Sequence, residues 1–329
     1  MHDASATHLR PPRALPTIHR DDPASTHEQA TTATTDQGRQ TTDISPPLPV
    51  PLTHGIHWLL PGDIIVSALI VIPARYGSTR FPGKPLLRDS GKFLIQHVVE
   101  QAAKAKRAAK VVVATDDARI KDAVESFDAA AVMTSPNHQS GTDRIAEVML
   151  KPEFAAFDVV VNVQGDEPEI EPELIDNLIR VTSQPGGGIP MATVAAPFAN
   201  ARDIANPNIV KVVVDQRGNA LYFSRSVIPF DRDGLVLQSE MGNLKSKIPQ
   251  SFALAGLYRK HLGIYAYQRT ALLQIAQTPP CDLEKLEKLE QLRALFLGLR
   301  IHVLHTTNAP SGIDTPEDYA AFLQRLASR

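Results

Sequence analysis

Apolar positions along this chain follow two patterns, short continuous runs and longer stretches with helical spacing. The runs SALIVIP, KVVVAT and DVVVNVQ leave no polar face, which is typical of buried parallel strands. Each run is followed by a stretch with helical spacing, at 93–106, 117–127 and 171–182. This alternation predicts an α/β fold in which helices flank a mostly parallel central sheet.

The C-terminal part of the chain is more mixed. We expect further strands and helices there, with shorter spacers: strands at 208–215, 220–225, 262–267 and 300–305, and helices at about 282–297 and 315–327. They predict a smaller mixed sheet region beside the main sheet. In the first of these helices, leucine recurs every third position, at Leu283, Leu286, Leu289 and Leu292. That spacing over one short helix favours a core-facing side over a coiled coil.

The N-terminal residues lack any apolar periodicity. The stretch ATTATTDQGRQTTDISPPLPVPLTHG is rich in Thr, Pro, Asp and Gln, so it cannot bury enough apolar surface to offset its ordering entropy. We therefore expect residues 1–63 to form a disordered extension and residues 64–329 to form the folded domain. We also expect that translation can begin at Val66, because a valine codon can serve as a bacterial start.

Composition narrows the classes of partner. The net charge of −2 gives no basic surface for nucleic acid or for an anionic membrane. The local basic cluster at 104–110 is interpreted as a solvated face. The single cysteine, Cys281, rules out a disulfide framework within the chain and fits the reducing cytoplasm. The apolar run Ile64–Ile72 is too short to span a bilayer as a helix. We therefore expect a cytoplasmic protein without nucleic-acid or membrane partners.

Polar loops follow the first three predicted strands. ARYGSTRFPGKP follows the first, TDD the second and QGDEP the third. Ligands in open α/β sheets bind at the carboxyl ends of the strands, so these loops are expected to form one site.

The first loop has the chemistry of an anion site without a familiar phosphate-binding motif. Five residues separate Gly77 from Gly83, and Pro85 stands where a Walker A loop has a hydroxyl residue. Small residues let backbone N–H groups approach an anion. The loop's cationic side chains suit a polyphosphate, and they are Arg75, Arg80 and Lys84. The alternative is an exposed basic loop.

The third loop carries Asp166 directly after a predicted strand. A carboxylate near a polyphosphate is repelled unless a divalent cation lies between them, which is how Mg²⁺ is commonly shared between protein and phosphates. The alternative is that Asp166 caps the next helix.

Several segments occur in an order that resembles a known family. They are IPARYGSTRFPGKPL, ATDD, HQSGTDRIAEV, VNVQGDEP, NPNIVKVV, ALYFSRSVIPFDRD, KHLGIYAY, LEKLEQLR and GIDTPEDYAAF. From about residue 67 to the C-terminus the chain is similar to 3-deoxy-manno-octulosonate cytidylyltransferases, the CMP-Kdo synthetases. The resemblance implies a nucleotide-diphospho-sugar transferase-like fold and a nucleotidyltransferase that joins CTP and Kdo into CMP-Kdo and pyrophosphate for lipopolysaccharide biosynthesis. It also implies a homodimer, with the mixed sheet region serving sugar binding and dimerisation.

The resemblance also assigns site residues. The CTP-binding residues are Arg75, Ser78, Lys84, Ser140, Gly141 and Gln164. The ligands of Mg²⁺ are Asp166 and Asp314. The catalytic residues are Arg75, Lys84, Asp166 and Asp314. The Kdo-binding residues are Arg225, His261, Tyr265, Glu290 and Gln291.

Each of these assignments has a plain structural alternative. Asp314 with Thr315 and Pro316 fits the cap of the last helix. In the sugar site, Arg225 can be a surface arginine, His261 a satisfied core histidine and Glu290 a residue of a helix face.

The chain departs from the family at the N-terminal extension, at Phe230, where tryptophan is common, and over 234–263. Two alternative functions stay open, a cytidylyltransferase for another acidic 2-keto sugar, such as sialic acid or amino-Kdo, and a nucleotide-binding protein without turnover.

Overall fold

The computed structural model describes residues 67–77, 81–138, 140–184, 188–232, 257–307 and 312–328. The chain divides into two units, Met1–Trp58 and Leu59–Arg329, and all of the described residues belong to the second unit. The expected N-terminal extension, the start at Val66 and loop residues Ser78 and Arg80 lie outside the described residues.

The described elements alternate as the pattern predicted. The strands are β1 Ala68–Ala74, β2 Ala108–Thr115, β3 Ala131–Met133, β4 Val159–Asn162, β5 Met191–Pro197, β6 Lys211–Val214, β7 Ala220–Ser224, β8 Arg259–Gln268 and β9 Ile301–His305. The α-helices are α1 Leu94–Ala102, α2 Ala118–Glu125, α3 Gly141–Leu150, α4 Pro172–Thr182, α7 Arg269–Gln277, α8 Asp282–Glu287, α9 Gln291–Phe296 and α10 Pro316–Ala327. Short 3-10 helices cover Lys84–Leu86, Pro152–Phe154 and Ala201–Ala205.

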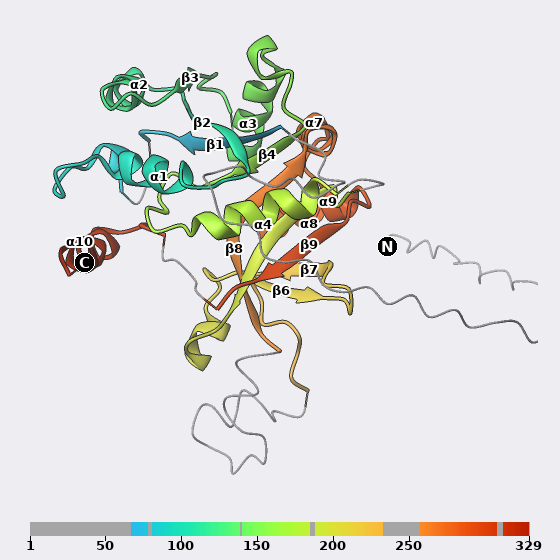
Figure 1. The fold of residues 1–329 in the computed structure, drawn as a ribbon. Helices are drawn as coiled ribbons and strands as arrows, with labels where there is room; N and C mark the ends of the chain where they lie inside the picture. The colour runs from blue at the N-terminus through green and yellow to red at the C-terminus, as the bar shows by residue number, and fades with distance from the viewer. Residues whose placement is uncertain are drawn as a thin grey trace, which may run out of the picture. The chain divides into compact units, whose positions relative to one another are not determined.

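The central sheet is mostly parallel, which confirms the predicted fold class. Within the described residues the strand order is β3-β2-β1-β4-β8-β5-β9. The first four strands in this order are parallel to one another, and β5 is parallel to β9. Strand β8 runs antiparallel to both its neighbours, β4 and β5. The antiparallel pair β6 and β7 joins β8 and forms the mixed region (Figure 1).

Helices cover both faces of this sheet because its strands are apolar on both sides. In β1, Ile70 and Ile72 pack in the layer that contains α1, α2 and α4. Leu69 and Val71 point the other way, into the layer of α3, α7 and α9 (Figure 1). Helix α10 has its own apolar contacts, in which Phe322 packs with Leu94 at the start of α1. No helix in the described ranges has the length and apolarity needed to cross a membrane.

Strand β8 contains a bulge that brings two side chains together. Thr193 of β5 pairs with Tyr265, but the next residue, Val194, pairs with Leu262, so Gly263 and Ile264 are extra on β8. Four residues of regular strand span about 13 Å. Here the rings of His261 and Tyr265 lie 5.3 Å apart between centroids. The bulge therefore turns two distant positions of one strand toward a common site.

The helix predicted at about 282–297 is wrong as a single helix. It is divided into α8 and α9, and Lys288 between them has a left-handed φ of 55°. The core-facing interpretation of its leucines is wrong for half of them. Leu289 and Leu292 are buried, while Leu283 and Leu286 are exposed, because the break rotates the two halves relative to each other. The basic cluster Lys104, Lys106, Arg107 and Lys110 is exposed as expected, although it follows α1 rather than lying within it.

Candidate active site

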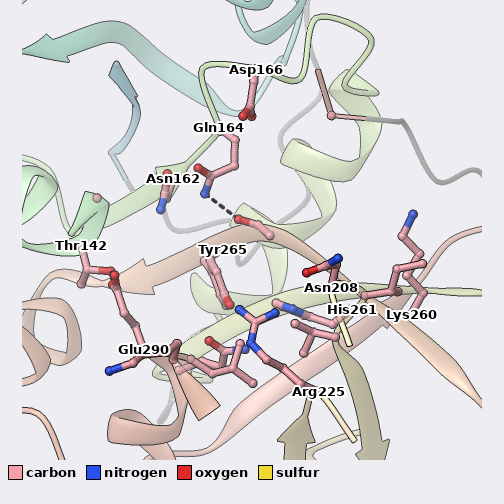
Figure 2. A pocket seen from close by; sticks show the side chains of 18 of the residues that line it. Thr142, Asn162, Gln164, Asp166, Asn208, Arg225, Lys260, His261, Tyr265 and Glu290 are labelled. Carbon is pink, nitrogen blue, oxygen red and sulfur yellow. Dashed lines mark hydrogen bonds between the residues drawn. The ribbon is translucent and has the colours of Figure 1, made fainter. Parts of the chain in front are cut away.

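A cavity of about 940 Å³ opens where the loop after β4 meets β8, the α8–α9 junction and the start of α10. It gathers most of the residues predicted for the site, which come from distant parts of the sequence (Figure 2). Its lining includes Gly141, Gln164, Asp166, Arg225, His261, Tyr265, Glu290, Gln291 and Asp314. The structure thus places the residues assigned to the metal and to the sugar around one space.

A smaller cavity of about 210 Å³ adjoins the first and is lined by four residues assigned to the nucleotide. Arg75 and Ser140 line it, and it shares Gly141, Gln164 and Glu290 with the larger cavity. The Ser140 hydroxyl accepts a hydrogen bond from the Asp143 N–H at 3.1 Å and so caps α3. The N-terminus of α3, with its unpaired N–H groups, therefore faces both cavities.

Gln164 joins the loop after β4 to the bulge of β8. Its Nε2 donates to the Gly263 carbonyl oxygen at 2.8 Å, the bond drawn in Figure 2. This bond holds the amide at the boundary between the two cavities.

Two aspartates share one cationic group beside the larger cavity. The ammonium of Lys84 donates to Asp166 Oδ2 at 2.6 Å and to the Ile313 carbonyl oxygen at 2.8 Å, and lies 3.4 Å from Asp314 Oδ1. A backbone hydrogen bond from Ile313 N to Asp166 O, at 2.9 Å, joins the two segments that carry the carboxylates. Gly83, with a φ of 71°, makes the turn that brings Lys84 there. These two carboxylates therefore converge on a point that a cation can occupy.

The capping alternatives are wrong for both aspartates. Thr315 caps α10, in a capping box with Asp318, whose carboxylate accepts from the N–H groups of Asp314 and Thr315. Helix α4 begins after Glu171, so Asp166 does not cap it. The carboxylates of Asp166 and Asp314 line the cavity instead.

The neighbouring Glu167 does not line the cavity. Burial and the nearby Asp166 carboxylate raise the pKa of Glu167 to about 8, and its Oε2 is buried without a hydrogen-bond partner among the described residues. Those residues contain no cluster of three or more His, Cys, Asp or Glu side chains suited to a metal. A pair of carboxylates remains, and such a pair fits Mg²⁺, which completes its coordination with phosphates and water.

Arg225, at the end of β7, is held by backbone carbonyl groups rather than lying loose on the surface. Its Nε donates to the Glu287 carbonyl oxygen at 2.8 Å, and its Nη1 to the Pro207 carbonyl oxygen at 3.0 Å. The side chain lines the cavity and is half-buried. Arg225 is thus a partly buried arginine that is anchored at the edge of the cavity.

His261 is both a satisfied core histidine and a cavity residue. Burial lowers its pKa to about 3, so the ring is neutral at neutral pH. The Thr193 hydroxyl lies 2.8 Å from the Ile264 carbonyl oxygen and 3.0 Å from His261 Nε2. If the hydroxyl donates to Ile264, it accepts from Nε2–H, which leaves Nδ1 of His261 as an acceptor. Burial also raises the pKa of Tyr265 well above its ordinary value, so its hydroxyl keeps its proton.

Glu290 and Gln291 lie at the start of α9. The Thr142 hydroxyl donates to Glu290 Oε2 at 2.5 Å, and burial raises the pKa of Glu290. Across the α8–α9 break, Arg293 Nε donates to Glu284 Oε2 at 2.7 Å. This buried ion pair holds the two short helices together and keeps the first residues of α9 at the cavity.

Several residues that line the larger cavity were not predicted from the sequence. They are Thr142, Asn162, Asn206, Asn208, Lys260 and Lys288. The asparagines have a recognisable signal, since Asn162 ends a buried strand and Asn206 and Asn208 flank a proline just before another. Figure 2 shows Asn162 beside Gln164, and Asn208 near His261 on the sugar side.

Comparisons with known proteins find similar cytidylyltransferases. Residues 69–301 match the family model described as cytidylyltransferase. Relatives named 3-deoxy-manno-octulosonate cytidylyltransferase include one from Idiomarina loihiensis, 49% identical over 258 residues, which cover 77% of this chain and 96% of that protein. Another, from Geobacter sulfurreducens, is 46% identical over 257 residues, covering 78% and 98%. A solved structure of CMP:2-keto-3-deoxy-manno-octonic acid synthetase complexed with CTP is 42% identical, with a TM-score of 0.69, over 80% of this chain and 99% of that one.

Proposed function

This chain belongs to the family of 3-deoxy-manno-octulosonate cytidylyltransferases, and we propose on that premise how its cavity transfers CMP from CTP to Kdo. The reaction releases pyrophosphate and gives CMP-Kdo for lipopolysaccharide biosynthesis. The observation that carries the proposal is that one cavity is lined by Asp166 and Asp314, which share the Lys84 ammonium, and also by the polar side chains of Arg225, His261 and Tyr265.

The phosphate side consists of the first loop, the loop after β4 and the start of α10. The cations Arg75 and Lys84 offset the negative charge of the triphosphate and of the departing pyrophosphate. The N-terminus of α3 adds N–H donors and a positive dipole end near the same space. We assign Mg²⁺ to Asp166 and Asp314, where it would offset charge on the phosphates as the bond to the α-phosphorus changes. The shared Lys84 ammonium supports this assignment, since both carboxylates already face one cationic group.

The sugar side orients the acceptor. Arg225 binds the carboxylate of Kdo, and the neutral His261 and Tyr265 form hydrogen bonds with its hydroxyl groups. Glu290 and Gln291 contribute further hydrogen bonds from α9. The anomeric hydroxyl then attacks the α-phosphorus, loses its proton, and displaces pyrophosphate. Because both substrates are held in one cavity, their alignment supplies a large part of the rate enhancement.

Three further features are part of the proposal. The cofactor is Mg²⁺, the location is the cytoplasm, and the protein is a homodimer through the mixed sheet region. Leu221 on β7 is 62% exposed and supports an interface there. Sedimentation of the purified protein tests the dimer.

Release of pyrophosphate from CTP, Mg²⁺ and Kdo tests the function, with the product identified by mass spectrometry. We expect turnover that depends on all three components and is lost in Asp166→Asn. A panel of 2-keto sugar acids, including sialic acid and amino-Kdo, identifies the preferred acceptor. If CTP binds but no acid releases pyrophosphate, the chain is a nucleotide-binding protein without turnover.

A further inference from the structure

The last residue of α8, Glu287, holds Arg225 at two points. Its carboxylate Oε2 accepts from the backbone N–H of Arg225 at 2.9 Å, and its backbone carbonyl accepts from the side-chain Nε at 2.8 Å. The second carboxylate oxygen, Oε1, accepts from the hydroxyl of Ser224 at 2.6 Å. Both carboxylate oxygens of Glu287 are therefore used to fix the end of β7, and their orientation is set by two separate donors.

The end of α8 is suited to receive a cation. Backbone carbonyls in the last turn of a helix lack partners within the helix, and the same end carries negative dipole charge. Lys288 takes a left-handed conformation and its N–H donates to the Glu284 carbonyl oxygen at 2.8 Å, which ends the helix there. The chain turns away after Glu287, and Arg225 caps the helix end.

A buried lysine fixes Arg225 from the opposite side. The ammonium of Lys211 donates to the carbonyl oxygens of Arg225, at 2.5 Å, Ile209, at 2.7 Å, and Asn206, at 3.1 Å. Lys211 has no exposed surface. The N–H and the carbonyl of Arg225 are thus both bonded to charged side chains, so its backbone has little freedom to move.

The guanidinium keeps donors and charge for a ligand. It has five N–H donors, and the contacts with Glu287 and Pro207 use two of them. Among the described residues its partners are carbonyl oxygens, with no carboxylate paired to it. Its positive charge is thus available to an anion in the cavity that Arg225 lines. A planar guanidinium with neighbouring N–H groups matches a carboxylate, which a lysine in the same place would not do.

We propose that Glu287 is a positioning residue, which sets the guanidinium of Arg225 at the place where the carboxylate of the sugar acid binds. Glu287 is absent from the cavity lining, so it acts through Arg225 and not by touching the substrate. This inference rests on the proposed function, because it needs an acidic sugar in the cavity.

Glu287→Gln tests the inference. Glutamine keeps the size of the side chain but removes its charge and has one terminal acceptor, so either the Ser224 hydroxyl reverses from donor to acceptor or the Arg225 N–H loses its partner. We expect the KM for Kdo to rise about tenfold, a loss typical of a hydrogen bond to a charged group. The KM for CTP and the kcat at saturating Kdo should stay within about twofold of wild type, since the phosphate side is unaffected.

Three further variants sharpen the test. Asp282→Asn makes the same change of charge on the same helix at a side chain that is 93% exposed, and should leave both KM values unchanged. Adding Glu287→Gln to Arg225→Ala should raise the KM for Kdo no further than Arg225→Ala alone, because Glu287 acts through that arginine. If Glu287→Gln does not fold, Ser224→Ala, which removes one anchor of the carboxylate, takes its place with an expected rise of about threefold.

The outcomes separate the inference from the proposed function. If none of the 2-keto sugar acids makes the wild-type protein release pyrophosphate from CTP, the proposed function is wrong. The inference, which depends on it, is then wrong as well. Suppose instead that the wild-type protein is active and that Arg225→Ala raises the KM for Kdo but not the KM for CTP. Either of two results with Glu287→Gln then overturns the inference while the proposed function stands. One is an unchanged KM for Kdo, and the other is an equal loss toward both substrates together with a lower melting temperature, which indicates a merely structural role.

Discussion

Replacing Lys84 with methionine should destabilise the ligand-free protein, and Mg²⁺ should restore the loss. The Lys84 ammonium is 2.6 Å from Asp166 and 3.4 Å from Asp314, and its side chain is only 14% exposed. Methionine keeps the unbranched shape and removes the charge. The two carboxylates then lose the ammonium that they share.

The size of the effect follows from these distances. The sum of the two distances from the Lys84 ammonium, 2.6 Å and 3.4 Å, is the largest possible separation of the two carboxylate oxygens, roughly 6 Å. Two like charges at that separation repel by about 3 kcal/mol at an effective dielectric constant of 20. The side chain of Asp314 is 44% exposed, and water screens much of this repulsion. With the lost hydrogen bonds included, we expect a decrease of about 1–2 kcal/mol in the free energy of unfolding. That corresponds to a melting temperature lower by about 3–6 °C.

Thermal unfolding with EDTA and with millimolar MgCl₂ measures both parts of the prediction. Lys84→Met should melt below wild type in EDTA, and MgCl₂ should raise its melting temperature more than that of wild type, because Mg²⁺ replaces the removed ammonium between Asp166 and Asp314. Lys121→Met, which removes an exposed lysine paired with Glu125, is the matched control and should change little. If Lys84→Met melts like wild type in EDTA, or gains no more from MgCl₂ than the control, the two carboxylates do not share a cation site.

Further predictions concern the metal, the sugar and the pH dependence. Asp166→Asn and Asp314→Asn should each lower kcat at least about 100-fold, about 2.7 kcal/mol, with folding intact, and the double variant should lose much less than the sum. Steady-state kinetics and melting curves check this, and an Asp314→Asn that melted lower but kept its kcat would contradict it. Arg225→Ala should raise the KM for Kdo far more than the KM for CTP in the same assay, whereas equal effects would remove Arg225 from the sugar site. Burial lowers the pKa of His261 from 6.5 to about 3, so the stability it contributes is complete above pH 6.5 and is lost as the pH falls toward 3. His261→Asn should therefore flatten the dependence of the free energy of unfolding on pH in that window, as urea titrations at several pH values would reveal, and an unchanged slope would speak against it.

The parallel part of the sheet could be predicted from sequence because its strands have no polar face. For β1, β2 and β4 the predicted ranges agree with the structure to within about two residues. Strand β5 was missed because MATVAAP is alanine-rich and has weak strand propensity, and it is a strand through its pairing with β8 and β9. The break at Lys288 has no glycine or proline to mark it. It depends on tertiary contacts, among them the hydrogen bond from Arg225 to the end of α8.

The candidate site could be predicted in part for similar reasons. Asp166 was placed by topology, since a residue directly after a buried parallel strand lies at the ligand edge of the sheet. Local sequence patterns could not predict that Asp314 lies near Asp166. The hydrogen bonds of Lys84 and Ile313 that join the two residues connect segments that are distant in the sequence. The same holds for His261 and Tyr265, whose proximity depends on the bulge in β8. Glu287 gave no signal in the sequence beyond that of a helix-face glutamate.

The position of β8 also has a consequence for biosynthesis. This strand lies between β4 and β5, although it follows β5 in the chain by some sixty residues. While the ribosome is still making that intervening stretch, β4 and β5 have already been synthesised, yet each lacks the neighbour that completes its hydrogen bonding. Pairing that closes late and over long sequence separations slows folding and leaves strand edges exposed to other chains. The strand that carries His261 and Tyr265 is therefore also the one that joins β4 to β5, and only β9, made later still, completes the pairing of β5.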